Sequence, residues 1–156
     1  MDGAITQEII SPIEKQQILD EINKWLDSIY PYKRPAAELC DHINRDSDFF
    51  RIDAHRKKFR LYLRFGKTWV SSRKKSIVIS QISFEKKRSG HGTALLKLLT
   101  KLAKMYHYEL IAIESVNDNS RAFALRFNFC GYDSDNNYII DTESLHGIFE
   151  KEMSDF

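Results

Sequence analysis

The sequence contains little of what marks secreted, membrane-spanning or metal-binding proteins. It has two cysteines, three prolines and six glycines in 156 residues, and no apolar run approaches the roughly 20 residues of a membrane-spanning helix. Cys40 and Cys130 have no paired spacing and no histidine at metal-ligand spacing, so neither a disulfide nor a metal site is predicted. We expect both to be buried small apolar side chains in a reducing compartment. With an acidic, weakly apolar start, these absences predict a soluble cytoplasmic protein.

The residues that are present suffice for one hydrophobic core. Hydrophobic residues make up 42% of the chain, and a chain of this length normally folds around a single core. No internal repeat or low-complexity segment divides it. We therefore expect one domain over residues 1–156.

The N-terminal part, residues 11–45, is predicted to be helical. Ser11 offers an N-cap, Pro12 suits the first helical position, and Glu14 can complete a capping box. An apolar stripe then runs to a stop at Pro31. It consists of Ile18, Ile22, Trp25, Leu26 and Ile29. A second helix is expected over residues 35–43, and both helices would form scaffold or a substrate-side wall.

From Phe59 the spacing of the apolar residues changes from the helical period to a period of two residues. Apolar residues at 59, 61, 63 and 65 alternate with Arg60, Tyr62 and Arg64, which predicts a half-buried strand with a basic outer face. A turn at 66–67, a short strand at 68–70 and a link over 71–76 are expected next. Residues 77–84 are apolar enough for a central strand, and a helix from Thr93 to Tyr106 would carry the chain to a parallel neighbour at 110–116.

Two glycines stand between the central strand and this helix. Gly90 and Gly92 allow backbone N–H groups to point at an anion near the positive end of the helix, where Lys86, Lys87 and Arg88 add charge. The same glycines could serve the geometry of the turn alone. A Walker A loop is excluded because no lysine follows Gly92. The dinucleotide fingerprint is excluded because its third glycine is missing.

These residues resemble the GCN5-related N-acetyltransferase (GNAT) family. The family's diphosphate-binding pattern corresponds to KRSGHGTALL at residues 87–96, with Lys87 at a position where the family has arginine or glutamine and Arg88 one place later. Asn119, Ala122 and the Gly131-Tyr132 pair match a second family feature. The resemblance covers about residues 58–141, as an acyl-CoA-binding core. It implies a mixed α/β fold in which helices flank a central mixed sheet with two splayed parallel strands.

The resemblance also implies acetyl-CoA as co-substrate and assigns the residues that hold it. The backbone of Ile82, Ser83 and Phe84 would pair with the pantetheine arm, and Asn119 would reach the arm from the other side or cap the next helix. The turn would hold the diphosphate. Its residues are Lys87, Arg88, Ser89, Gly90, His91, Gly92 and Thr93.

Acetyl transfer to a primary amine needs a group that takes a proton from the amine. Glu114 is the candidate, because it lies in the strand predicted at the splay, where burial would raise its pKa. It could equally form an ion pair with a basic residue of a neighbouring strand, and Glu85 is the reserve. The family often has a tyrosine that protonates the departing thiolate, but this chain has Phe127 there. Solvent or Arg126 would then serve, or the site is inert.

Charge is strongly segregated along the chain. Residues 51–75 carry ten basic side chains against one acidic, a net +9, and residues 133–156 carry seven acidic against one basic, a net −6. The two stretches could neutralise each other, form solvated faces, or bind partners. The leading hypothesis is an acetyl-CoA-dependent N-acyltransferase acting on a small-molecule, protein or charged-RNA amine. The alternative is a catalytically silent GNAT-like module that binds a nucleic acid or acidic protein through residues 51–75.

Overall fold

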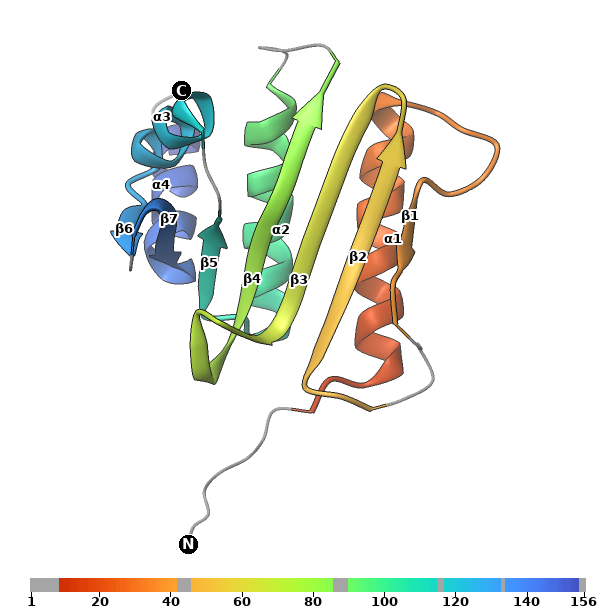
Figure 1. Cartoon of the computed structure of the whole chain (residues 1–156), viewed down its shortest axis with the longest axis horizontal. Helices are drawn as coiled ribbons and strands as arrows, with labels where there is room; N and C mark the ends of the chain where they lie inside the picture. Colours follow the sequence, from red (N-terminus) through yellow and green to blue (C-terminus); the bar gives the residue numbers. More distant parts are fainter. Residues whose placement is uncertain (1–8, 42–45, 86–89, 115–116, 133, 155–156) are drawn as a thin grey trace, which may run out of the picture.

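The computed structural model describes residues 9–41, 46–85, 90–114, 117–132 and 134–154. Within these ranges a seven-stranded sheet has the order β1-β2-β3-β4-β5-β7-β6 (Figure 1). The strands are β1 (Ala37–Leu39), β2 (Phe49–Arg56), β3 (Phe59–Thr68), β4 (Ser71–Phe84), β5 (Leu110–Ile113), β6 (Cys130–Tyr132) and β7 (Ser134–Asp141). The helices are α1 (Pro12–Ile29), α2 (His91–Tyr106), α3 (Asp118–Arg126) and α4 (Thr142–Ser154).

The sheet is mixed, and β4 and β5 form its parallel pair. β1 to β4 are antiparallel neighbours, β4 and β5 run parallel, and β7 returns antiparallel between β5 and β6. Helix α2 makes the crossover between the parallel strands, as predicted. The mixed α/β fold class expected from the resemblance, a central mixed sheet flanked by helices, is confirmed.

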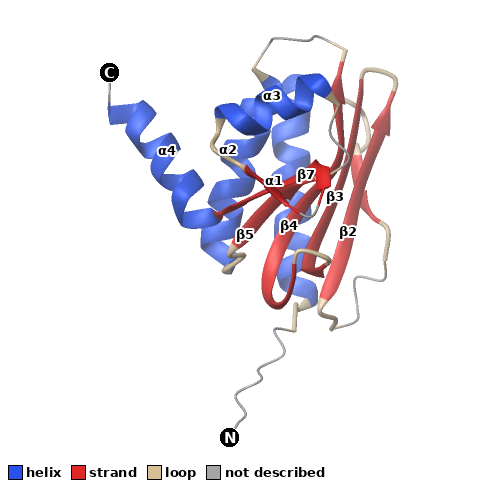
Figure 2. Cartoon of the chain, turned by 60° about the vertical axis from the view of Figure 1, so that its left-hand side comes forward, coloured by secondary structure: helices blue, strands red, loops and turns tan. Residues whose placement is uncertain are grey.

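Helices α1 and α2 cover the same face of β2, β3 and β4 (Figures 1 and 2). The apolar alternation of β3 places Leu61, Leu63 and Phe65 in the core between sheet and helices, each fully buried. From the helices, Ile18, Ile22, Leu95 and Leu99 complete this layer. The opposite face of these strands carries the polar residues of the alternation, so the predicted basic outer face of β3 is confirmed.

Helix α1 forms for the local reasons predicted. The Ser11 hydroxyl accepts a hydrogen bond from the Glu14 N–H at 3.2 Å, and Pro12 occupies the first turn. The helix ends at Ile29, two residues before Pro31. Its buried stripe includes Ile18 and Ile22, while Trp25 and Ile29 are partly buried at its margin.

The Glu14 side chain ties α1 to the sheet instead of closing a capping box. Its Oε2 accepts from Lys75 Nζ at 3.0 Å and from the Tyr108 hydroxyl at 2.6 Å. Lys75 also donates to the Tyr106 carbonyl at 2.8 Å, and its ammonium lies 4.2 Å from the centre of the Tyr108 ring. This cluster joins α1, β4 and the end of α2. Lys75 and Glu14 are mostly buried, with side chains 8% and 16% exposed.

The predicted helix over residues 35–43 is wrong. The segment contains strand β1, which pairs with β2 through Ala37 opposite Ala54. The Asn23 side chain of α1 exchanges two hydrogen bonds with the Ala37 backbone, at 2.7 and 3.0 Å. These contacts with distant residues outweigh a local apolar spacing that suits a helix.

The elements between residues 66 and 76 also differ from expectation. β3 continues through Gly66 to Thr68, and β4 begins at Ser71, so residues 71–76 belong to a strand and are not a link. Arg73 and Lys74 are exposed there, beyond the core, and charged side chains in water give no apolar alternation. Helix α2 begins at His91, two residues before the predicted Thr93.

Both cysteines are exposed, contrary to expectation. Cys40 directly follows the edge strand β1, and Cys130 lies in the edge strand β6. No helix in the described residues is long and apolar enough to span a membrane. The described ranges also bring together no group of three metal-ligating histidine, cysteine, aspartate or glutamate side chains.

Candidate functional site

The pairing between the parallel strands β4 and β5 ends part of the way along β4. They pair from Ser76 with Leu110 to Ile79 with Ile113, and the Glu114 N–H still donates to the Ile79 carbonyl at 3.1 Å. β4 then runs on to Phe84, paired only with β3 among the described residues. In an antiparallel pair, alternate residues direct their N–H and C=O groups away from the partner strand. The end of β4 therefore offers backbone groups along the edge that β5 leaves open, as the predicted pantetheine site requires.

A register shift lies at the same point. β3 and β4 pair Leu63 with Ile79 but Tyr62 with Gln81, so Ser80 is an extra residue without a partner in β3. Its Oγ is buried and has no hydrogen-bond partner among the described residues. Buried hydroxyls are normally hydrogen-bonded. Ser80 was absent from the predicted site, because its position depends on a bulge that the sequence does not reveal.

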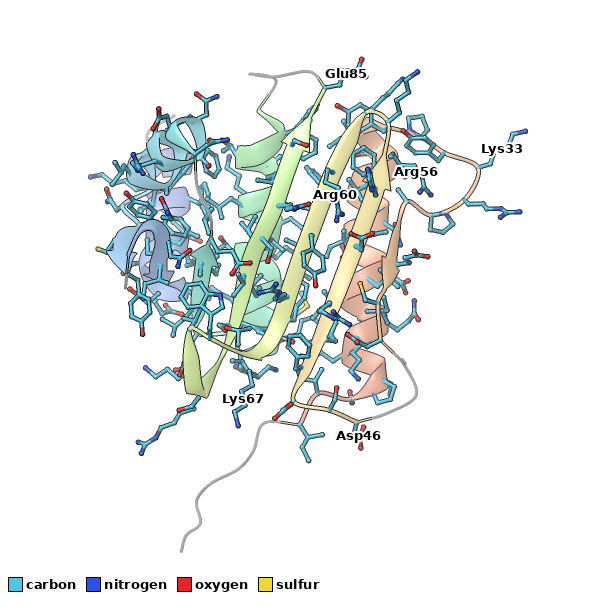
Figure 3. The ribbon with its side chains drawn as sticks, in the orientation of Figure 1. Lys33, Asp46, Arg56, Arg60, Lys67 and Glu85 are labelled. Atoms are coloured by element: carbon cyan, nitrogen blue, oxygen red, sulfur yellow. The ribbon has the colours of Figure 1, made fainter. Side chains whose placement is uncertain are left out.

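Glu114 follows β5 and lies opposite this bulge. Its Oε2 accepts a 2.6 Å hydrogen bond from Trp69 Nε1, and its Oε1 lies 3.2 Å from Arg64 Nη1. The carboxylate thus has an ion pair with a basic residue of the sheet, the structural alternative for it, although its partner Arg64 belongs to β3, on the other side of β4. An ionised carboxylate has about four lone-pair sites, so these two donors leave capacity for a third. Glu85, the reserve candidate, is exposed at the far end of β4 (Figure 3).

An open groove of about 370 Å³ adjoins Glu114 on the outer face of the sheet. Two of its lining residues, Arg64 and Trp69, are the residues that bind the Glu114 carboxylate. Phe49, Arg51, Tyr62 and Thr68 complete the lining. The groove therefore lies beside the two residues that hold the Glu114 carboxylate, although Glu114 itself does not line it.

The arginines on this face have acidic partners. Arg51 forms a two-pronged pair with Asp41, at 2.8 and 3.2 Å, and these hydrogen bonds lower the pKa of the Asp41 carboxyl. Arg60 pairs with Asp53. Arg60 and Arg64 also lie over the Tyr62 ring, at 5.8 and 5.4 Å from its centre.

The glycine turn has the geometry of a helix N-terminus that is open to a ligand. Gly90 is the N-cap of α2 in the left-handed region, with φ at 79°, and no side chain caps the helix there. A side chain at Gly90 would meet no described atom within 4 Å. Gly92 and Thr93 lie in the first turn, half-buried. The predicted ligands Lys87, Arg88 and Ser89 lie outside the described residues.

An aromatic cluster supports the start of α2. The His91 ring lies 5.3 Å from Phe84 and 5.8 Å from Tyr30, and Tyr30 stacks on Phe59 at 5.2 Å. The His91 side chain therefore packs against other rings, and His91 is the first residue of the helix. Tyr30, at the end of α1, is 7% exposed, and its hydroxyl has no hydrogen-bond partner among the described residues. These ring contacts join the C-cap of α1 to the start of α2.

Asn119 does not cap α3. The N-cap is Asn117, whose Oδ1 accepts from the Ser120 N–H at 2.9 Å, while Ser120 Oγ accepts from the Asn117 N–H in return. Asn119 is exposed in the first turn of α3. Its contact with the pantetheine arm stays a prediction.

Phe127, at the position where the GNAT family often has a tyrosine, has apolar surroundings. Phe127 is buried and packs against Phe123 and Phe149, with ring centres 5.1 and 5.4 Å apart. Arg126 is exposed, and its guanidinium lies 5.0 Å from the centre of the Phe127 ring. Phe127 is therefore part of the core, with no group that exchanges a proton.

Lys75 is buried in the cluster with Glu14, and the other nine basic residues of the stretch 51–75 are divided among three places (Figure 3). Arg56, Lys57 and Lys58 lie at the tip of the β2–β3 hairpin, next to the end of β4, where the Glu85 N–H donates to the Lys58 carbonyl at 2.8 Å. Arg51, Arg60 and Arg64 lie on the outer sheet face in ion pairs. Lys67, Arg73 and Lys74 are exposed at the opposite end of the strands. Within the described ranges, ion pairs join none of the ten to residues 133–156.

Comparison with known proteins yields structural neighbours only. No protein-family model and no curated protein sequence matches the chain. The KacTA–DNA complex is 14% identical, covering 85% of this chain and 86% of that chain with a TM-score of 0.49. AtaTR bound with AcCoA is 12% identical, covering 65% and 73%, with a TM-score of 0.48. AtaT complexed with acetyl-methionyl-tRNAfMet is 10% identical, covering 65% and 76%, with a TM-score of 0.44. Likeness at this level leaves the substrates and partners of this chain open.

Proposed function

We propose that this protein is an acetyl-CoA-dependent N-acetyltransferase that moves an acetyl group to a primary amine by direct attack. The observation that carries the proposal is the stretch of β4 that continues beyond its pairing with β5, beside an uncapped helix N-terminus. Backbone groups of Ile82, Ser83 and Phe84 line the open edge of β4. The N–H groups at the start of α2 form the positive end of the helix, where a diphosphate is stabilised. One extended ligand with an anionic end fits both features.

The residues present fit such a substrate. Gly90 leaves open space where any side chain would protrude, and the buried hydroxyls of Ser80 and Tyr30 lack partners in the described structure. When bound, acetyl-CoA supplies an activated thioester. Ile82, Ser83 and Phe84 would orient its arm, while Gly90, Gly92 and Thr93 would hold the diphosphate, joined by Lys87, Arg88 and Ser89.

The chemistry assigned to the protein is proton transfer and orientation. A lysine-like amine has a pKa near 10.4 and attacks only after losing a proton. Glu114 would accept that proton directly or through water as the nitrogen bonds to the carbonyl carbon. The carbon–sulfur bond then breaks, and the thiolate takes a proton from solvent because Phe127 has none to give.

A charge placed in the glycine turn tests the substrate site. We expect Gly90→Glu to weaken acetyl-CoA binding at least tenfold, because a carboxylate would repel the diphosphate at the helix terminus. Gly90→Asn is the matched control, since asparagine tolerates the left-handed conformation without adding charge. Calorimetric titration of both folded variants measures the difference. Equal affinities of Gly90→Glu and Gly90→Asn would remove the turn from the binding site.

The hairpin tip supports a second candidate function, contact with a polyanion. Arg56, Lys57 and Lys58 form no ion pair with the described residues, unlike the arginines of the sheet face. They lie at the end of the molecule where β4 leads into the glycine turn (Figure 3). A polyanionic acceptor bound there would lie close to the proposed acetyl-CoA site.

Substitution of all three tip residues by glutamine tests this contact. We expect weaker binding to single-stranded RNA, and a plot of log affinity against log salt that is shallower by roughly 0.7 for each phosphate that the variant no longer neutralises. The control replaces Lys67, Arg73 and Lys74, at the opposite end, by glutamine. An equal effect of both triple variants would indicate attraction by net charge alone. An unchanged slope in the tip variant would identify the tip as a solvated surface.

A further inference from the structure

Ser80 stands where the proposed reaction would take place. The last residues paired between β4 and β5 are Ile79 and Ile113, so Ser80 and Glu114 are the next residues along the two strands. The Glu114 N–H donates to the carbonyl of Ile79, the residue directly before Ser80. The bulge at Ser80 and the carboxylate of Glu114 therefore flank the point at which the strands separate.

The Ser80 hydroxyl lowers the stability of the folded protein in its observed environment. Its Oγ is buried without a partner among the described residues, although a buried hydroxyl that lacks a hydrogen bond lowers stability. Ser76, four residues earlier on the same strand, shows the usual arrangement. Its buried Oγ is hydrogen-bonded with Thr68 Oγ1 at 2.6 Å and donates to the Gly66 carbonyl at 3.2 Å.

We infer that the Ser80 hydroxyl is a catalytic hydrogen-bond donor to the carbonyl oxygen of the bound thioester. The inference rests on the proposed function and adds a residue to it. As the amine nitrogen bonds to the carbonyl carbon, the carbonyl oxygen takes up negative charge and accepts the Ser80 hydrogen bond. Glu114 takes the amine proton. The carbonyl double bond re-forms as the carbon–sulfur bond breaks, and the thiolate takes a proton from solvent. A donor already in place near developing charge favours the transition state over the substrate.

The first test compares stability without any substrate. Ser80→Ala removes an unpartnered hydroxyl, so we expect its melting temperature to be unchanged or raised by up to about 4 °C. Ser76→Ala, the matched control, breaks two hydrogen bonds and should lower the melting temperature by about 2–8 °C. A destabilised Ser80→Ala would mean that the hydroxyl has a structural role, which overturns the inference.

The second test observes the hydrogen bond directly. The ¹³C resonance of [1-¹³C]acetyl-CoA should move downfield on binding to the wild-type protein, and this shift should disappear with Ser80→Ala. Wild type should also bind acetyl-CoA about 2- to 12-fold more tightly than CoA, the range of one net hydrogen bond. Ser80→Ala should bring this ratio close to one, whereas Ser80→Thr, which keeps a hydroxyl, should retain part of it.

The outcomes separate this inference from the function on which it rests. If neither CoA nor acetyl-CoA binds the wild-type protein, the proposed function fails and the role of Ser80 fails with it. If both bind and Ser80→Ala changes neither the ¹³C shift nor the affinity ratio, the proposed function stands and Ser80 is not the donor. For an amine that the wild type acetylates, Ser80→Ala should lower kcat about 10²- to 10³-fold.

Discussion

Glu114→Gln should lower turnover about 10²- to 10⁴-fold at neutral pH while leaving acetyl-CoA affinity nearly unchanged. This is the usual contribution of a general base. Glutamine keeps the shape of the side chain and an oxygen that can accept from Trp69 Nε1, but it cannot take the amine proton. Release of free thiol from acetyl-CoA, with an amine that the wild type acetylates, measures the effect.

The pH dependence identifies the mechanism of that loss. The defect of Glu114→Gln should shrink as the pH rises toward the pKa of the acceptor amine, because the amine then loses its proton without help. Glu85→Gln, at the exposed end of β4, is the control and should behave like the wild type. A defect that is constant with pH would indicate that Glu114 serves to form the ion pair with Arg64 and does not take the amine proton. A defect confined to Glu85→Gln would move the base to that residue.

Glu14→Ala should have the largest effect on stability, a decrease of about 3–5 kcal/mol in the free energy of unfolding. The substitution leaves the Lys75 ammonium buried without its carboxylate and removes the acceptor of the Tyr108 hydroxyl. Urea unfolding measures it. Gln16→Ala, on the exposed side of α1, should change stability by less than about 0.5 kcal/mol.

A double substitution separates the charge from the packing in this cluster. Glu14→Leu combined with Lys75→Met removes both buried charges and should be more stable than Glu14→Ala. A decrease below about 1 kcal/mol in Glu14→Ala would show that water or the Tyr106 carbonyl satisfies Lys75 without the carboxylate.

Features set by neighbouring residues could be predicted from the sequence. The cap of α1 at Ser11, the alternation of β3 and a left-handed glycine before α2 each depend on a few consecutive side chains, and the structure has Ser11, the alternation and Gly90 in these roles. The alternation of Phe50, Ile52 and Ala54 could likewise have revealed β2, to which no element had been assigned. The helix prediction for residues 35–43 failed because Asn23 and β2, distant in sequence, hold Ala37–Leu39 as a strand.

The details of the candidate site depend on contacts that no local pattern encodes. Trp69 and Glu114 are 45 residues apart, and their hydrogen bond requires the β3–β4 turn to lie against the end of β5. Ser80 gains its position from one extra residue in β4 relative to β3. The acidic partners of Arg51, Arg60 and Arg64 are brought to them by the fold, so the charge count of residues 51–75 overstated the basic surface.

Isothermal titration with acetyl-CoA tests the central claim most directly, because both the divergent strands and the helix terminus are assigned to this one substrate. We expect saturable binding with one site per chain, weakened by Gly90→Glu and retained by Glu114→Gln. Binding should also raise the melting temperature as the acetyl-CoA concentration increases. The absence of both heat and a thermal shift at millimolar acetyl-CoA, in a folded wild-type protein, would contradict the proposed function.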